Sequence, residues 1–121
     1  MEKQIRDLKQ RTYKYALGVI QYLEDLPRGY ITETLAKQLL RSATSVGANV
    51  VEAQSSSSRK DFTNFYTHAL KSANESKFWL TLLRDSGKNG SERLPQLLNE
   101  TNELSRILAS SILSLKGRKS F

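Results

Sequence analysis

The chain has no cysteine among its 121 residues, which excludes a disulfide framework, a zinc knuckle and a cysteine nucleophile. The absence also fits a reducing compartment. No apolar run reaches the roughly 18 residues that a membrane helix needs. The N-terminal segment MEKQIR lacks the apolar core of a signal peptide. We therefore expect a cytoplasmic protein that is not embedded in a membrane.

The residue sets that carry catalysis are also missing. His68 is the only histidine, and a metal site or a general base would need about two further convergent groups beside it. The sequence has no phosphate-binding G-x-x-x-x-G-K-[ST] loop and no Ser/His/Asp set. We expect no enzyme activity, no metal, no cofactor and no small-molecule substrate, and we interpret His68 as a residue on the flank of its helix.

Acidic residues are a minority: 12 Asp and Glu stand against 19 Lys and Arg, a net charge of +7. A basic balance of this size on a short chain indicates a polyanionic partner, either RNA, DNA or an acidic membrane surface. Membrane binding is the less favoured of these, because the basic N-terminal segment has no strong apolar anchor outside its core stripe. The alternative is that the charge only keeps the domain soluble.

Helix-breaking segments occur at three places, which divide the chain into four segments. The joints are Pro27–Gly29, the serine tract 55–58, and the stretch 86–91 with two glycines. Apolar residues repeat at spacings of three and four between them, which predicts helices over about 4–26, 32–54, 59–84 and 92–115. Thr32 is the expected N-cap of the second helix, and Ser58 with Asp61 forms an expected capping box for the third.

Each predicted helix exceeds 20 residues, or roughly 30 Å. Short joints make consecutive helices antiparallel, and neither a strand pattern nor an internal repeat competes with this interpretation. The sequence therefore predicts an all-α fold, an antiparallel up-down-up-down four-helix bundle, as a single domain over residues 1–121.

The second predicted helix carries a core stripe and, beside it, a stripe of hydrogen-bonding residues. With one residue of the next helix, this polar stripe comprises Gln38, Arg41, Ser45, Asn49, Glu52 and Glu75. Such a cluster can resemble an active site. We favour a structural role, with hydrogen bonds between helices, and a pair of Arg41 with a carboxylate, fixing the helix register.

These residues also carry a family resemblance. The residues that carry it are the polar stripe of the second helix with Val46, then Asp61-Phe62, Ala69-Leu70-Lys71, Ala73-Asn74-Glu75-Ser76, Trp79-Leu80 and Leu82-Leu83. In this combination the chain, from Leu8 to Leu115, resembles the four-helix-bundle proteins encoded in intervening sequences of bacterial 23S rRNA genes, the S23 family. The accessory variability determinant (Avd) of diversity-generating retroelements uses the same fold. Ala53 and Ser72 depart from the pattern, which commonly has Gly and Glu there.

The resemblance implies a ring-shaped homopentamer without catalytic activity that uses a basic surface on nucleic acid. Three functions remain open. The first is a free-standing nucleic-acid-binding oligomer, for which RNA is favoured over DNA. The second is an Avd-type subunit that binds a reverse transcriptase and its template RNA. The third is a protein scaffold with no nucleic-acid role.

The predicted topology places most of the net charge at one end of the bundle. There, nine basic residues stand against four acidic ones, whereas five stand against five at the other end. The nine predicted nucleic-acid-binding residues are Lys3, Arg6, Lys9, Arg11, Arg59, Lys60, Lys116, Arg118 and Lys119. Because the sequence offers no recognisable aromatic platform, we expect contacts to phosphates rather than to bases.

Large apolar residues outside a core stripe usually belong to an interface. Phe78, Trp79 and Leu82 lie on the flank of the third predicted helix. We expect them, with Ile107 and Ile112 of the fourth helix, to form contacts between subunits. The alternative is a wide core stripe that covers them.

Overall fold

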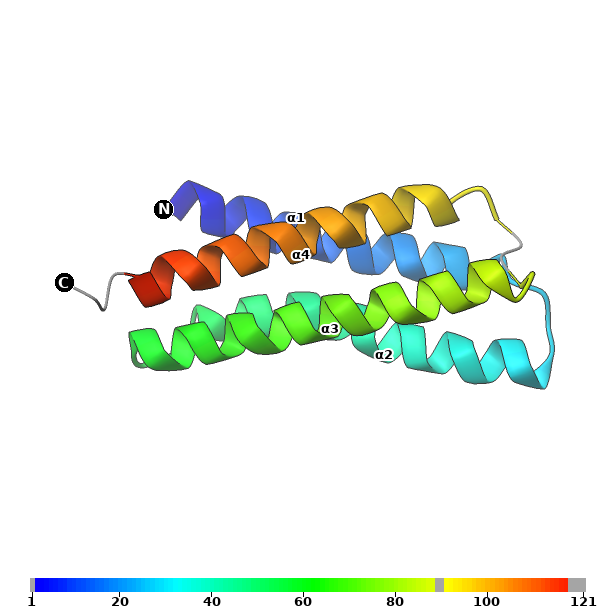
Figure 1. Cartoon of the computed structure of the whole chain (residues 1–121), viewed down its shortest axis with the longest axis horizontal. Helices are drawn as coiled ribbons and strands as arrows, with labels where there is room; N and C mark the ends of the chain where they lie inside the picture. The colour runs from blue at the N-terminus through cyan, green and yellow to red at the C-terminus, as the bar shows by residue number, and fades with distance from the viewer. Residues whose placement is uncertain (1, 89–90, 118–121) are drawn as a thin grey trace.

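The protein forms four long helices that lie side by side, as Figure 1 shows. The computed structural model describes residues 2–88 and 91–117. The helices are α1 (Glu2–Glu24), α2 (Tyr30–Ala53), α3 (Arg59–Asp85) and α4 (Leu94–Gly117). Consecutive helices run in opposite directions, and α1 begins at the same end of the molecule at which α4 ends. The antiparallel four-helix bundle is confirmed.

The helix ends follow local chemistry, with one departure from prediction. The Ser58 hydroxyl accepts a hydrogen bond from the Asp61 backbone N–H at 3.1 Å and caps α3 as expected. The predicted N-cap Thr32 is wrong, because α2 begins at Tyr30 after Gly29 and Thr32 is buried in the first turn. At the far end of α3, Gly87 has a φ of +76°. This left-handed turn allows Lys88 N–H to reach the Leu83 carbonyl, which ends the helix.

The core is a continuous column of apolar side chains from all four helices. Leu39, Leu80, Leu83, Leu104 and Leu108 have no exposed surface. Each such leucine contributes about 1.5–3 kcal/mol by leaving water. The 3–4 spacing therefore locates most of the buried face of each helix. In α3, Thr63 and Tyr66 are buried while Phe62 and Phe65 are half-buried, and α4 buries Ile112 rather than Ser111.

Two buried hydrogen bonds cross between helices within this core. Tyr15 of α1 donates its hydroxyl proton to Thr101 Oγ1 of α4 at 2.6 Å, since Thr101 itself donates to the Leu97 carbonyl. The Ser42 hydroxyl of α2 and the Ser76 hydroxyl of α3 lie 2.8 Å apart. Buried polar pairs of this kind specify the register of neighbouring helices.

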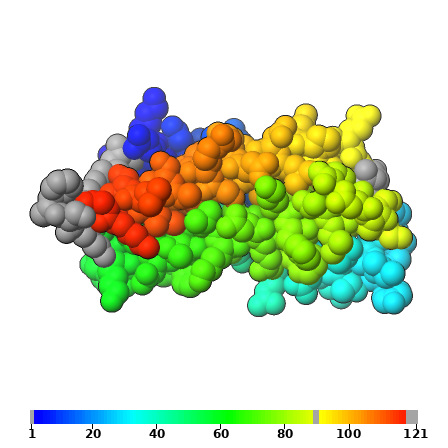
Figure 2. Space-filling model, viewed as in Figure 1, coloured from blue at the N-terminus to red at the C-terminus, as the bar shows by residue number. Residues whose placement is uncertain are grey.

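The four helices do not pack equally closely. Each contacts its two neighbours around the bundle, and in the described ranges the diagonal pairs make no close backbone approach. The α2–α3 pair approaches over the longest stretch, and the α1–α4 pair over the shortest. Figure 2 shows side chains of α3 and α4 filling the face toward the viewer. The loosest seam in the bundle is therefore the one between α1 and α4.

Candidate nucleic-acid interface

The predicted basic residues gather at one end of the bundle, where α1 begins, α2 joins α3, and α4 ends (Figure 1). We call this end the basic pole. Its described cationic residues are Lys3, Arg6 and Lys9 of α1, Arg59 and Lys60 of α3, and Lys116 of α4, all of them exposed. Arg118 and Lys119 lie outside the described residues, and their assignment stays a prediction.

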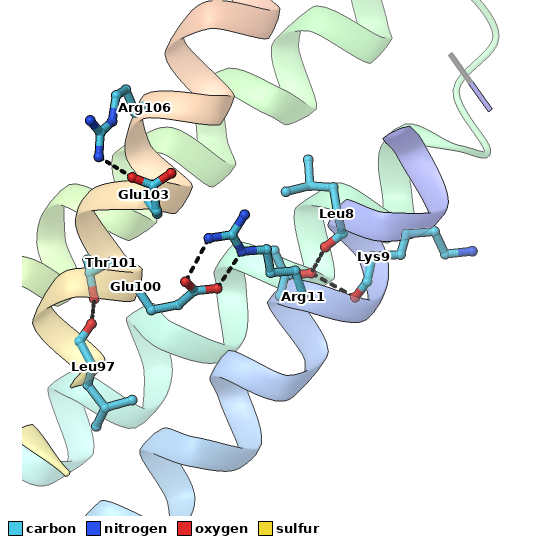
Figure 3. A network of polar contacts seen from close by, with 9 residues as sticks. Leu8, Lys9, Arg11, Leu97, Glu100, Thr101, Glu103 and Arg106 are labelled. Carbon is cyan, nitrogen blue, oxygen red and sulfur yellow. Dashed lines mark hydrogen bonds and ion pairs between the residues drawn. The ribbon is translucent and has the colours of Figure 1, made fainter. Parts of the chain in front are cut away.

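Arg11 differs from the other predicted members, because its charge is compensated within the fold. Its guanidinium donates two hydrogen bonds to the Glu100 carboxylate of α4, with Nε–Oε2 at 2.7 Å and Nη2–Oε1 at 2.9 Å (Figure 3). The hydrogen bond to Glu100 raises the pKa of Arg11 above its ordinary value. Arg11 therefore serves as a clamp between α1 and α4, and we remove it from the predicted phosphate-binding set.

Four acidic residues share the basic pole with the cations: Glu2, Asp7, Glu52 and Asp61. The Asp61 carboxylate accepts a hydrogen bond from the Ser57 hydroxyl at 3.1 Å, within the connection between α2 and α3. The six described cations exceed these acids, so the pole remains positive without Arg11.

The opposite end of the bundle is balanced and partly self-paired. Arg84 Nε lies 2.9 Å from Asp85 Oδ1, and Arg93 Nε lies 3.5 Å from Asp25 Oδ2. Arg93 also donates to Gln21 at 3.0 Å. The contrast between the two ends, which the sequence predicted from topology, persists when the observed ion pairs are counted.

The basic pole is hollowed. A groove of about 470 Å³ runs between α1 and α4, and a second hollow of about 420 Å³ lies beneath the α2–α3 connection. Ile5, Phe62 and Leu115 line both, so the two hollows adjoin each other. Arg106 lines the groove and Arg59 lines the second hollow. The charged surface therefore surrounds an apolar floor, which the sequence did not reveal.

The predicted polar stripe lies on the outer side of α2 and α3, but its described hydrogen bonds stay within single helices. Ser45 donates to the Arg41 carbonyl and Asn49 to the Ser45 carbonyl, both at 2.8 Å. Trp79 Nε1 donates to the Glu75 carboxylate at 3.2 Å. The bonds between helices come instead from other pairs, among them the buried pairs Ser42–Ser76 and Tyr15–Thr101 and the partly exposed Arg11–Glu100.

The predicted subunit interface divides between two places. The side chains of Phe78 and Leu82 are 58% and 37% exposed. Trp79 is half-buried, and its ring packs edge-on against the Phe78 ring with 4.9 Å between the ring centroids. Ile112 is buried in the core, so this part of the prediction is wrong. Ile107 is half-buried and lines the groove between α1 and α4 rather than a surface shared with Phe78.

A second set of exposed apolar residues, on α1 and α2, was missed. Its members are Tyr13, Leu17 and Ile20 on α1 and Leu40 and Val51 on α2. The two helices approach closely, since a Cβ at Gly47 would lie 3.2 Å from Thr12 Oγ1. The signal was present in the sequence, because residues 13, 17 and 20 have helical spacing outside the core stripe of α1.

The described residues offer no metal centre and no membrane span. No group of three histidine, aspartate or glutamate side chains converges within 2–88 and 91–117, and His68 is exposed on α3. In the same ranges, no helix combines the length and hydrophobicity that crossing a bilayer requires.

Comparison with known proteins identifies the family. The model of the 23S rRNA-intervening sequence protein family matches residues 6–110. A crystal structure of a protein of unknown function, from the S23 ribosomal protein family of Bacteroides thetaiotaomicron VPI-5482, is similar with a TM-score of 0.77. It is 32% identical, over 89% of this chain and 96% of that one. No curated protein matches. The chain belongs to the 23S rRNA-intervening sequence protein family.

Proposed function

We propose that this protein binds nucleic acid through its basic pole, RNA in preference to DNA, as a homo-oligomer and without catalysis. The observation that carries the proposal is the unequal charge of the two ends. Six exposed Lys and Arg residues outnumber the acids at one end, whereas the other end is balanced. Phosphate contacts from such a surface release counterions, which supplies most of the affinity in sequence-independent binding.

Two further features support the finer parts of the proposal. The family description refers to 23S rRNA, the setting in which the gene occurs, and so makes RNA the first ligand to test. The exposed apolar residues on α1 and α2, together with Phe78 and Leu82 on α3, favour self-association, because monomers rarely leave contiguous apolar patches uncovered. A ring of five, as the S23 resemblance implies, would repeat the basic pole around one axis.

The test is a fluorescence-anisotropy titration with a structured RNA and a duplex DNA of equal length, repeated over a series of salt concentrations. We expect binding whose affinity falls steeply with salt, and tighter binding of the RNA. The variant Arg59→Glu/Lys60→Glu should weaken binding by about tenfold or more at low salt. Glutamates in the first turn of α3 are compatible with the helix dipole, so folding should be retained.

The matched control is Lys71→Glu/Lys77→Glu, which makes the same charge change on exposed residues of the same helix. It should bind within about twofold of the wild type, if phosphate contacts at the pole set the affinity. Sedimentation should give the same oligomeric state for both variants. Equal losses in the two variants would contradict the placement of the site, and no binding at low salt would overturn the function.

A further inference from the structure

The hollow at the basic pole has a structural cause in the residues of α4. On the side of the pole beyond the Arg11–Glu100 clamp, α4 presents Ser110, Ser111 and Ser114 to the groove. Serine side chains are too short to fill the space between two helices, so the seam stays open there. In contrast, the α2–α3 seam buries small residues against one another and closes.

The walls of this hollow combine an aromatic floor with hydrogen-bonding sides. The half-buried Phe62 ring lies against Tyr66 with 4.6 Å between ring centroids. Ser111 donates to the Ile107 carbonyl at 2.9 Å, which leaves its oxygen able to accept. Gln4 lines the groove and Gln54 the second hollow. A flat group with polar edges suits these walls better than an aliphatic chain does.

The charges around the hollow select an anionic occupant. Arg59 lines the second hollow, and the α1 cations Lys3 and Arg6 lie at the same end, whereas the charge of Arg106 in the groove is compensated within α4. The one carboxylate that lines the groove, Glu103, is ion-paired with Arg106 along α4 (Figure 3). A volume of about 470 Å³ is within the range of small-ligand sites.

We propose that this hollow receives an unpaired base of a single-stranded nucleic acid or loop, while the flanking phosphates lie on the cations of the basic pole. A duplex presents phosphates but keeps its base faces stacked, so it cannot reach the aromatic floor. An unstacked base can lie against Phe62 and present its edge to the serine hydroxyls. The inference rests on the proposed function and narrows it from nucleic acid in general to unpaired strands.

The test compares strands of equal charge. The probes are a mixed-sequence single-stranded RNA, an RNA duplex of half its length with the same number of phosphates, and an abasic strand with the same number of phosphates. We expect the single strand to bind at least about fivefold more tightly than the abasic strand, since stacking on an aromatic side chain is the added contact. Equal affinity for the single and abasic strands, or tighter binding of the duplex, would overturn the inference.

Matched variants locate the effect. Phe62→Leu removes the aromatic face of the hollow and keeps an apolar side chain, and Phe65→Leu makes the same change nearby on α3 at a half-buried residue outside the hollow. Only Phe62→Leu should reduce single-strand affinity, by about fivefold, and it should leave abasic binding unchanged. Equal effects of the two variants would contradict the placement, and thermal melting of both excludes misfolding as the cause.

Two outcomes separate this inference from the function on which it rests. If Arg59→Glu/Lys60→Glu weakens binding of every strand and Phe62→Leu changes nothing, the proposed function stands and the base site is wrong. If neither variant changes binding, both are wrong. Tighter binding to vesicles of anionic phosphatidylserine than to RNA, lost in Phe62→Leu, would assign the hollow to a lipid and overturn the inference.

Discussion

The seam between α2 and α3 is closed, whereas the seam between α1 and α4 opens into a groove at the basic pole. In the first, small buried residues such as Ala73 and the Ser42–Ser76 pair let the helices approach along their length. In the second, the helices are joined by the Tyr15–Thr101 hydrogen bond and by the Arg11–Glu100 ion pair, whose side chains are long. The comparison teaches that one seam holds the fold, while the other leaves room for a ligand.

The strongest test of this difference between the two seams is to introduce a larger side chain into each of them. Ala73→Leu inserts three carbons into a fully buried position and should lower the free energy of unfolding by about 1–3 kcal/mol. Ser111→Leu places a larger side chain in the groove wall and should change the free energy of unfolding by less than about 1 kcal/mol, because the groove has room for it. Urea denaturation of both variants measures the difference, and equal destabilisation would show that the α1–α4 seam is as tight as the other.

The buried tyrosine of the open seam should give the next largest effect. Tyr15→Phe removes the hydrogen bond to Thr101 and should cost about 0.5–1.5 kcal/mol, since Thr101 keeps its bond to the Leu97 carbonyl. Chemical denaturation measures the loss. A variant as stable as the wild type would mean that the α1–α4 register is set without this bond.

The Arg11–Glu100 clamp should contribute less, because both side chains remain partly exposed, by 40% and 29%. A double-mutant cycle with Arg11→Gln and Glu100→Gln should give a coupling of about 0.2–1 kcal/mol that decreases in high salt. Stability measurements at two salt concentrations determine it. A coupling of zero at low salt would show that the pair does not hold α1 to α4.

The smallest change in stability at neutral pH should come from substituting a second tyrosine of α1, Tyr22. In the described part of the chain, Tyr22 Oη is the buried side-chain polar atom without a hydrogen-bond partner. Tyr22→Phe should therefore be neutral or slightly stabilising, the opposite sign to Tyr15→Phe. Thermal melting of both variants in one buffer compares the signs, and a clear loss of stability in Tyr22→Phe would reveal a partner for this hydroxyl.

The buried Tyr22 hydroxyl should also make the stability of the fold depend on pH in the alkaline range. Burial raises its pKa to about 12, above the ordinary value of about 10. Its contribution to stability is therefore complete below pH 10 and is lost as the pH rises toward 12, when the unfolded chain ionises first. Stability of Tyr22→Phe should fall less than that of the wild type over this interval. Parallel curves would contradict the assignment.

The sequence predicted those features that depend on local periodicity. The 3–4 spacing located all four helices, and the capping serine Ser58 located the start of α3. Helix ends were less secure: α2 begins two residues before its predicted start at Thr32, because Gly29 rather than Thr32 provides the N-cap.

The features that the sequence did not predict depend on contacts across the bundle. Arg11 and Glu100 are 89 positions apart, so no local pattern shows that their charges cancel. Ile112 is buried and Ile107 lines the groove because of the rotation of α4 against α1, which periodicity fixes only approximately. The groove itself arises where three serines of α4 face α1, a match between helices that one helix alone does not reveal.

The most direct test of the account is to find where a bound strand touches the protein. Single-stranded RNA containing 4-thiouridine would be cross-linked by light to the wild-type protein, and the modified peptides identified by mass spectrometry. The account predicts cross-links at the basic pole, in peptides containing Phe62 and the first turns of α1. Cross-links concentrated instead at Tyr30, which is 82% exposed at the opposite end of the bundle, would contradict it.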